Sequence, residues 1–218
     1  KARIDGGIDA FREALARASA ASLALIIVPT VFIALNATGI TESILGRGQF
    51  DGVAVRQVSI VIMISSLALP LQFVFSVFQK GHVGLQKNLL VNAVGVFGQI
   101  IIVGLTLFLV PIWAHTGAAW IGPISTAALL FVTGVMLWRL NVAPNLRTVA
   151  LSLRAYSLTL VVILLAILGS YVGLGILGKS DITLVIGSGI SIVVSAVLLV
   201  FVLKVGPLVV IWRSITNR

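Results

Sequence analysis

Apolar residues fall in six long stretches that are separated by short polar segments, and together these stretches make up most of the chain. A helix rises 1.5 Å per residue, so about 20 apolar residues cross a hydrocarbon core of roughly 30 Å. The pattern therefore predicts an all-α, polytopic membrane bundle with six transmembrane helices. The predicted spans are Ala18–Leu35, Val58–Phe78, Leu89–Val110, Ala118–Leu137, Tyr156–Leu177 and Ile182–Leu203.

The polar segments divide the chain into five parts. The opening residues 1–17 predict a cytoplasmic amphipathic helix, with Ile8, Phe11 and Leu15 on one face and Arg12, Glu13 and Arg17 towards the headgroups. The chain opens without Met and without a signal-peptide pattern, so we expect a piece of a longer membrane protein that lacks its N-terminal half. The other parts are four helices over 18–138, a basic cytoplasmic loop over 139–155, a peripheral hairpin over 156–203 and a cytoplasmic tail over 204–218.

The basic residues are distributed unequally between the two sides of this six-span arrangement. One side carries 12 of the 15 Lys and Arg residues, and the other carries only Arg47, Arg56 and Lys179. Short loops rich in Lys and Arg stay in the cytoplasm. We therefore expect both termini on the cytoplasmic side of the membrane.

Composition excludes several other classes of protein. The chain is 59% hydrophobic and 10% charged, whereas soluble domains carry about 25% charged residues. Its net charge of +9 is spread over helix ends without a dense patch, so we expect contact with lipid headgroups and no nucleic acid. With no cysteine, and with His82 and His115 predicted in loops on opposite sides, we expect no metal, no cofactor and no enzyme active site. No acid falls inside a span, which excludes a carboxylate proton relay in this segment.

Polar residues form two stripes at helical spacing inside the apolar spans. One stripe on the second span holds Gln72, and one on the third holds Asn92 and Gln99. An unpaired amide in hydrocarbon costs several kcal/mol. The stripes therefore predict either hydrogen bonds between helices or a hydrated cavity. The full stripe on the second span is Ser65, Gln72 and Ser76, and the full stripe on the third is Asn88, Asn92, Gly95 and Gln99.

Two other features concern the shape of the spans. Prolines inside spans at Pro29, Pro70 and Pro123 predict kinks, because each removes a backbone donor. The fifth span contains Leu158–Leu168, which is apolar around the whole helix and suits contact with lipid.

The loop between the first two spans is the most distinctive stretch. Gly46 and Gly48 flank Arg47 and tolerate positive φ angles, and Asp51 is placed to cap the next helix. A capped surface turn explains Asp51 and both glycines but leaves Arg47 and Phe50 without a role. Arg47 and Arg56 are the candidate cations for a phosphate on this side, of a lipid headgroup or of a substrate, because a guanidinium holds phosphate with two hydrogen bonds.

The segment Ile44–Asp51, ILGRGQFD, resembles the L-F-x-R-G-x-F-D/T motif of the MurJ/MviN lipid II flippases of the MOP exporter superfamily. In that family the motif follows the ninth of fourteen helices, which begins with a short charged segment and contains a proline, matched here by Phe11–Arg17 and Pro29. Lys80–Asn88 matches the basic cytoplasmic loop, and His115–Ala119 matches the turn between the next two helices. The resemblance covers nearly the whole chain, as the last six helices of a partial transporter fold.

The resemblance implies transport of a lipid-linked oligosaccharide pyrophosphate, most closely the peptidoglycan precursor lipid II, across the cytoplasmic membrane. It also implies that the main substrate arginines lie outside this chain, and that the last two helices offer an apolar groove to the polyprenyl tail. The chain departs from the family over Phe78–Asn88, which lacks the usual Asp and Thr-Pro. A flippase for polysaccharide units, of the O-antigen type, and a non-transporting membrane scaffold are the alternatives.

Overall fold

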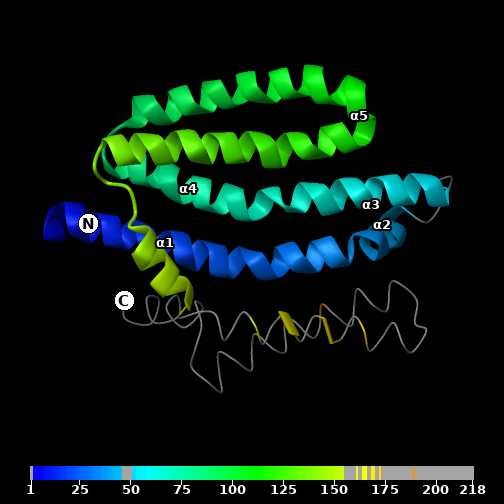
Figure 1. Ribbon diagram of the computed structural model, residues 1–218, viewed down its shortest axis with the longest axis horizontal. Helices are drawn as coiled ribbons and strands as arrows, with labels where there is room; N and C mark the ends of the chain where they lie inside the picture. Colours follow the sequence, from blue (N-terminus) through cyan, green and yellow to red (C-terminus); the bar gives the residue numbers. More distant parts are fainter. Residues whose placement is uncertain are drawn as a thin grey trace. The chain divides into compact units, whose positions relative to one another are not determined.

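The computed structural model describes residues 2–45 and 51–154, together with the single positions 161, 164, 165, 168, 169, 172 and 189. These residues are helical apart from short connections, and none of them is in a strand. The all-α prediction is therefore confirmed for this part of the chain. The helices are α1 (Ala2–Leu35), α2 (Ala37–Leu45), α3 (Gly52–Ser66), α4 (Ala68–Gly84) and α5 (Asn88–Arg139), and residues 146–154 are also helical (Figure 1).

Three helical stretches of the described chain are long and apolar enough to cross a membrane, namely Gly7–Leu35, Gly52–Gly84 and Asn88–Arg139. The first two contain the predicted first and second spans. The third contains the predicted third and fourth spans together. The predicted fifth and sixth spans lie almost wholly outside the described residues.

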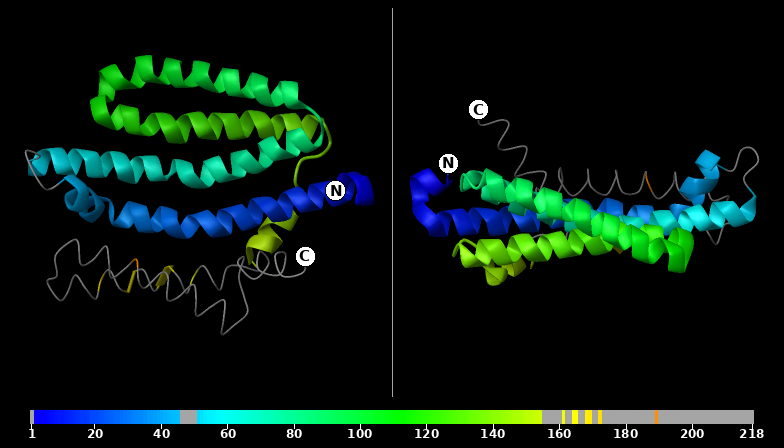
Figure 2. Two further views of the ribbon diagram at one scale, coloured as in Figure 1. Left: turned by 180° about the vertical axis from the view of Figure 1, so that it is seen from behind. Right: turned by 90° about the horizontal axis from the view of Figure 1, so that it is seen from above.

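Helix α5 folds back on itself at Ala114, whose φ of 46° and ψ of −125° are not helical. A straight helix would separate Gly98 from Leu129 by about 46 Å. Instead, a Cβ atom built on Gly98 would lie only 2.9 Å from Cδ1 of Leu129. The helix is therefore a hairpin, with a first arm over residues 88–113 and a second arm over 115–139 (Figures 1 and 2).

The chain forms two compact units, one of Lys1–Ile26 and Ile64–Leu153 and the other of Ile27–Met63 and Arg154–Arg218. In the first unit, the second arm of α5 runs parallel to α4. A Cβ atom on Gly122 would touch Ala68, and one on Gly134 would touch Phe78. The second arm thus lies between α4 and the first arm, as Figure 2 shows.

Helices α4 and α5 end in the same way. Lys87 N donates to His82 O and Val142 N donates to Leu137 O, each at 3.0 Å, across residues with positive φ at Gln86 and Asn141. These bonds define two Schellman motifs, which satisfy carbonyls that a helix end would otherwise leave free. Apolar residues from both ends and from α1 form a cluster around Leu15, Leu137 and Val142, with Phe11, Val77, Phe78, Leu85 and Ala143 packed against it.

The opening segment is helical, as predicted, with one break at Gly7 (φ 71°) that a side chain would strain. Leu15 is buried and Phe11 packs beside it, while Ile8 is more exposed. Arg17 donates to Glu13 at 2.6 Å, and Arg12 donates from Nε to the Ala143 carbonyl at 3.3 Å. The amphipathic face of α1 therefore packs on the ends of α4 and α5.

The backbone angles show no break at the three prolines for which kinks are predicted. Helices α3 and α4 are separated by one residue, Leu67, three residues before Pro70, and its φ of −63° and ψ of −21° are helical. Pro29 and Pro123 lie inside α1 and α5 without non-helical backbone angles of their own. The reversal of α5, at Ala114, follows Pro111 instead.

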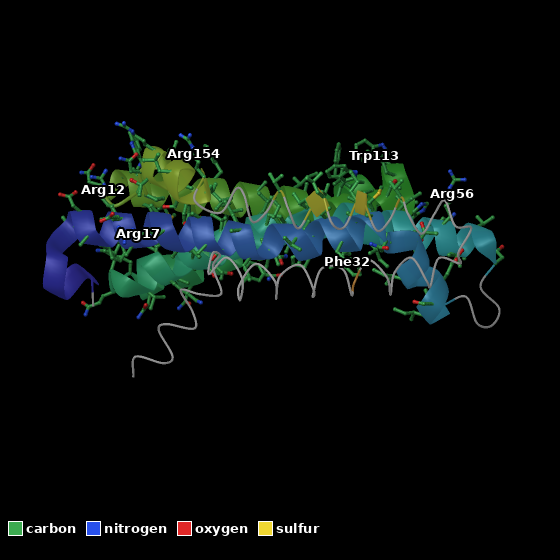
Figure 3. All side chains as sticks on the ribbon, turned by 90° about the horizontal axis from the view of Figure 1, so that it is seen from below. Arg12, Arg17, Phe32, Arg56, Trp113 and Arg154 are labelled. Carbon is green, nitrogen blue, oxygen red and sulfur yellow. The ribbon has the colours of Figure 1, made fainter. Side chains whose placement is uncertain are left out.

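The second unit holds α2, most of α3 and the few described positions beyond Arg154. Val161, Leu165, Leu168 and Val172 recur at helical spacing and are all exposed, while most of the predicted peripheral hairpin lies outside the described residues. Gly189 lies against Phe32, since a Cβ atom built on it would be 3.7 Å from Cζ of that ring. Arg56 and Arg154 lie at opposite ends of this unit (Figure 3).

Candidate functional site

The amide side chains predicted from the sequence all lie on the surface of the described chain. Gln72 is exposed on α4, and Asn92 and Gln99 are exposed on the first arm of α5. The other members of the two stripes, Ser65, Ser76, Asn88 and Gly95, are exposed as well. Within the described residues none of the three amides has a hydrogen-bond partner, so they do not join these helices to one another.

Two of these amides lie at the same level along the helices. The contacts of α4 with the second arm pair Ala68 with Gly122 and Phe78 with Gly134, which places Gln72 near the level of Leu129. Leu129 also contacts Gly98, the neighbour of Gln99. Gln72 and Gln99 therefore lie at one height on either side of the second arm, and Asn92 lies nearer the basic end.

This common level is deep in the apolar part of the helices. Gln72 precedes the end of α4 at Gly84 by 12 residues, or about 18 Å of helix. That is roughly the middle of a hydrocarbon core about 30 Å thick. The surrounding surface of the first arm is strongly apolar, with Leu107 73% exposed. The two glutamines are thus polar groups on otherwise apolar helix faces.

Several buried hydroxyl groups form hydrogen bonds within their own helices. Thr133 donates to the Leu129 carbonyl at 2.8 Å, and Ser125 donates to the Gly122 carbonyl at 3.1 Å, each within its own helix. Ser19, Thr41 and Ser59 likewise donate to carbonyls four residues earlier. Such bonds satisfy a hydroxyl without linking elements.

His82 corrects the sequence interpretation. The sequence predicts His82 and His115 in loops, but His82 lies in the last turn of α4 and His115 lies in α5 directly after the reversal. The His82 side chain is 1% exposed, and its Nε2 lies 3.4 Å from the Thr133 carbonyl. Its Nδ1 has no hydrogen-bond partner in the described part of the chain. The basic loop predicted over Lys80–Asn88 is correspondingly short, because α4 continues to Gly84.

The outer motif loop is described only at its end. Gly46, Arg47, Gly48 and Phe50 lie outside the described residues. Asp51 caps α3 as predicted, since its Oδ1 accepts a hydrogen bond from Ala54 N at 2.8 Å. Arg56 lies on α3 one turn later and is exposed.

Removing the Asp51 cap is expected to destabilise the chain. Asp51→Ala leaves Ala54 N–H without its acceptor, at an expected cost of about 0.5–2 kcal/mol, whereas Asp51→Asn retains a capping oxygen. Thermal unfolding of the purified chain in detergent measures both variants. Equal unfolding temperatures for Asp51→Ala and the parent chain would show that the cap contributes nothing.

The described residues contain no group of three or more His, Asp or Glu residues that could hold a metal ion. Comparison with models of protein families, with curated proteins and with solved structures gives no match.

Proposed function

We propose that this chain is part of a membrane flippase of the MOP exporter type, which moves a lipid-linked oligosaccharide pyrophosphate, most closely lipid II, across a bacterial cytoplasmic membrane. The observation that carries the proposal is the pair of unpartnered amides, Gln72 and Gln99, at one level deep in apolar helices. In this proposal they line a hydrated cavity, together with Asn92 nearer its cytoplasmic end.

The energetic argument starts from the cost of leaving these amides in lipid. An amide without a partner in hydrocarbon costs several kcal/mol, and the described chain supplies Gln72 and Gln99 with no partner. Either water or another polypeptide must cover them. A cavity between this chain and the proposed N-terminal half satisfies both amides and leaves the neighbouring apolar side chains against lipid.

The distribution of other groups fits transport of a phosphorylated lipid. Six spans with both ends in the cytoplasm place Arg47 and Arg56 at the outer side, where a guanidinium holds phosphate with two hydrogen bonds. Trp113 flanks the reversal of α5, and Trp138 ends its second arm beside Arg139. Tryptophan concentrates at membrane interfaces, so these two residues mark the two faces of the bilayer in this proposal.

One observation supports the alternative of a flippase for polysaccharide units. The stretch Phe78–Asn88, which lacks the lipid II family's Asp and Thr-Pro, is mostly the end of α4, and its His82 is buried. This end of α4 therefore offers packing rather than an exposed polar loop to a substrate. Growth of two depletion strains, one lacking the lipid II flippase and one lacking the O-antigen flippase, separates the alternatives when the full-length protein is supplied.

Water access to the amides tests the proposal directly. The chain has no cysteine, so single cysteines at Gln72 and Gln99 can be compared with cysteines at Leu107 and Phe131, which are 73% and 72% exposed. We expect a membrane-impermeant thiol reagent to label the first two positions in whole cells and to leave the two apolar positions unlabelled.

The paired substitution Gln72→Leu with Gln99→Leu should then abolish transport without lowering protein abundance, because it makes the cavity wall apolar. Leu107→Ile serves as the matched control. If neither cysteine at these two positions is labelled and the double variant supports normal growth, the transport proposal is wrong and the non-transporting scaffold is the better interpretation.

A further inference from the structure

A small pocket opens at the end of the first unit, where α1 meets the ends of α4 and α5. Its volume is about 150 Å³, and it is lined by Ile8, Phe11, Leu85, Lys87, Leu140 and Val142. An apolar cavity of this volume can hold a ring the size of benzene, so the pocket accommodates about six carbon atoms. We propose that it binds one anionic phospholipid, with the first carbons of an acyl chain in the pocket and the headgroup phosphate on Lys87.

The pocket is built by the two helix-ending motifs. Leu85 and Leu140 are the C-cap residues of α4 and α5, and the backbone N–H groups of Lys87 and Val142 are the donors that close the two Schellman motifs. Phe11 and Val142 belong to the buried cluster around Leu15 and Leu137, so the floor is packed. The walls are therefore fixed by backbone hydrogen bonds rather than by long side chains alone.

The remaining wall of the pocket comes from Ile8 and Phe11 of α1, just after the break at Gly7. Arg12 ties this wall to the chain beyond α5, because its Nε donates to the Ala143 carbonyl at 3.3 Å. Arg12 also lies 3.6 Å from Asp9, so that acid is already engaged by a cation of its own helix. The same holds for Glu13, which accepts a hydrogen bond from Arg17 at 2.6 Å.

Charge selects an anion as the occupant. Among the residues at this end of the first unit whose side chains the structure describes, six are basic and two, Asp9 and Glu13, are acidic and paired. The ends of α4 and α5 carry partial negative charge, which Lys87 and Arg139 offset. A net positive charge remains at the mouth of a pocket that is lined mainly by apolar residues. The six basic residues are Arg12, Arg17, Lys80, Lys87, Arg139 and Arg147.

The occupant must carry an apolar chain and a phosphate together, and it must reach a site at the end of membrane-crossing helices. A phospholipid of the surrounding leaflet meets both conditions. Soluble phosphate satisfies only the contact with Lys87, and a neutral lipid satisfies only the pocket. The inference needs the chain to lie in a bilayer, but it does not depend on transport of any substrate.

Native mass spectrometry of the purified chain with phosphatidylglycerol, and separately with phosphatidylcholine, tests the proposal. We expect one phosphatidylglycerol to be retained in preference to phosphatidylcholine. Lys87→Gln should weaken its retention about fivefold, the effect of one lysine near an anionic surface. Lys80→Gln is the matched control, because Lys80 lies two turns earlier on α4 and does not line the pocket. Equal weakening by both variants would show that the lipid responds only to the overall positive charge of this end, and it would overturn the proposal.

A second pair of variants tests the apolar part. Leu85→Trp should fill the pocket and abolish retention of the lipid, whereas Leu146→Trp, at an 81% exposed position, should not. Ile8→Trp fills the same pocket from α1 and replaces Leu85→Trp if that variant is not monodisperse. Glycerol phosphate at a concentration equal to the lipid should not displace it. Full displacement, or unchanged retention in the pocket-filling variants, would show that the acyl chain does not enter the pocket.

Discussion

Replacing Gly117 with valine is expected to collapse the α5 hairpin and to remove most of the folded protein. A Cβ atom built on Gly117 would clash with the Leu109 carbonyl oxygen and would lie 2.8 Å from the carbonyl carbon. Both atoms are backbone, so relief requires the reversal at Ala114 to open. Overpacking of flexible side chains costs about 1–3 kcal/mol, and a clash with backbone costs more. Proteins are stable by only about 5–15 kcal/mol, so the loss is large.

The matched control is Gly104→Ala on the first arm, because a Cβ atom there would meet nothing within 4 Å. Alanine in a helix interior is favoured over glycine by about 0.5–1 kcal/mol, so this variant should be as stable as the parent chain or more so. Yield of monodisperse protein and the unfolding temperature in detergent give the comparison. Equal behaviour of Gly117→Val and Gly104→Ala would mean that the close approach of the arms at Gly117 does not exist.

The sequence predicts this hairpin and the segment that contains its turn, but not the residue at which the chain reverses. Hydropathy ends the third span at Val110 and begins the fourth at Ala118, and the reversal at Ala114 lies between them. Composition does not single out Ala114, because a positive φ is usually adopted by glycine, and the nearby Gly117 is the residue that the sequence would favour. The role of Gly117 comes from contact across the turn, eight residues from Leu109, and such contacts are not visible in a hydropathy pattern.

The error at His82 has a similar cause. Flanking Lys80 and Lys87 suggest a polar loop, yet Phe78, His82 and Leu85 follow helical spacing. Phe78 and Leu85 pack against the buried cluster, and His82 is itself buried. Helical periodicity could have found this face, but the average hydropathy of a short basic segment hides it. Leu15 of α1 lies beside the neighbouring Gly81, and Thr133 of α5 lies beside His82, and both are tertiary contacts that the sequence pattern does not show.

The amide stripes were predictable because helical spacing alone places residues on one face. The sequence could not show whether these amides bond between helices or line a hydrated cavity, since that depends on which groups lie opposite them in the folded protein. The structure places Gln72 and Gln99 on the surface of the chain, so it removes hydrogen bonding between the described helices from the possible roles. Arg47 and its glycines lie outside the described residues, and their role stays a prediction.

Among substitutions that leave the backbone geometry unchanged, Leu137→Ala is expected to cause the largest loss of stability in the first unit. Leu137 is 0% exposed and is the C-terminal anchor of α5, with Leu15 and Val142 in the same buried cluster. Truncating a buried leucine removes its packing and leaves a cavity, at a cost of about 2–5 kcal/mol. Leu146→Ala, at a position 81% exposed, should change stability by less than about 0.5 kcal/mol. Unfolding temperatures in detergent measure both variants.

His82→Leu shows whether packing or the polar contact holds this end together. The bond from Nε2 to the Thr133 carbonyl is long at 3.4 Å, and Nδ1 is buried without a partner in the described chain. Leucine has a similar volume and leaves no polar nitrogen unpaired, so the net change should stay within about 1.5 kcal/mol. If His82→Leu destabilises the chain as strongly as Leu137→Ala, the contact with Thr133 is the main tie between α4 and α5. If Leu137→Ala alone is costly, the apolar cluster holds the lead-in helix α1 against both helix ends, and His82 serves mainly to fill space.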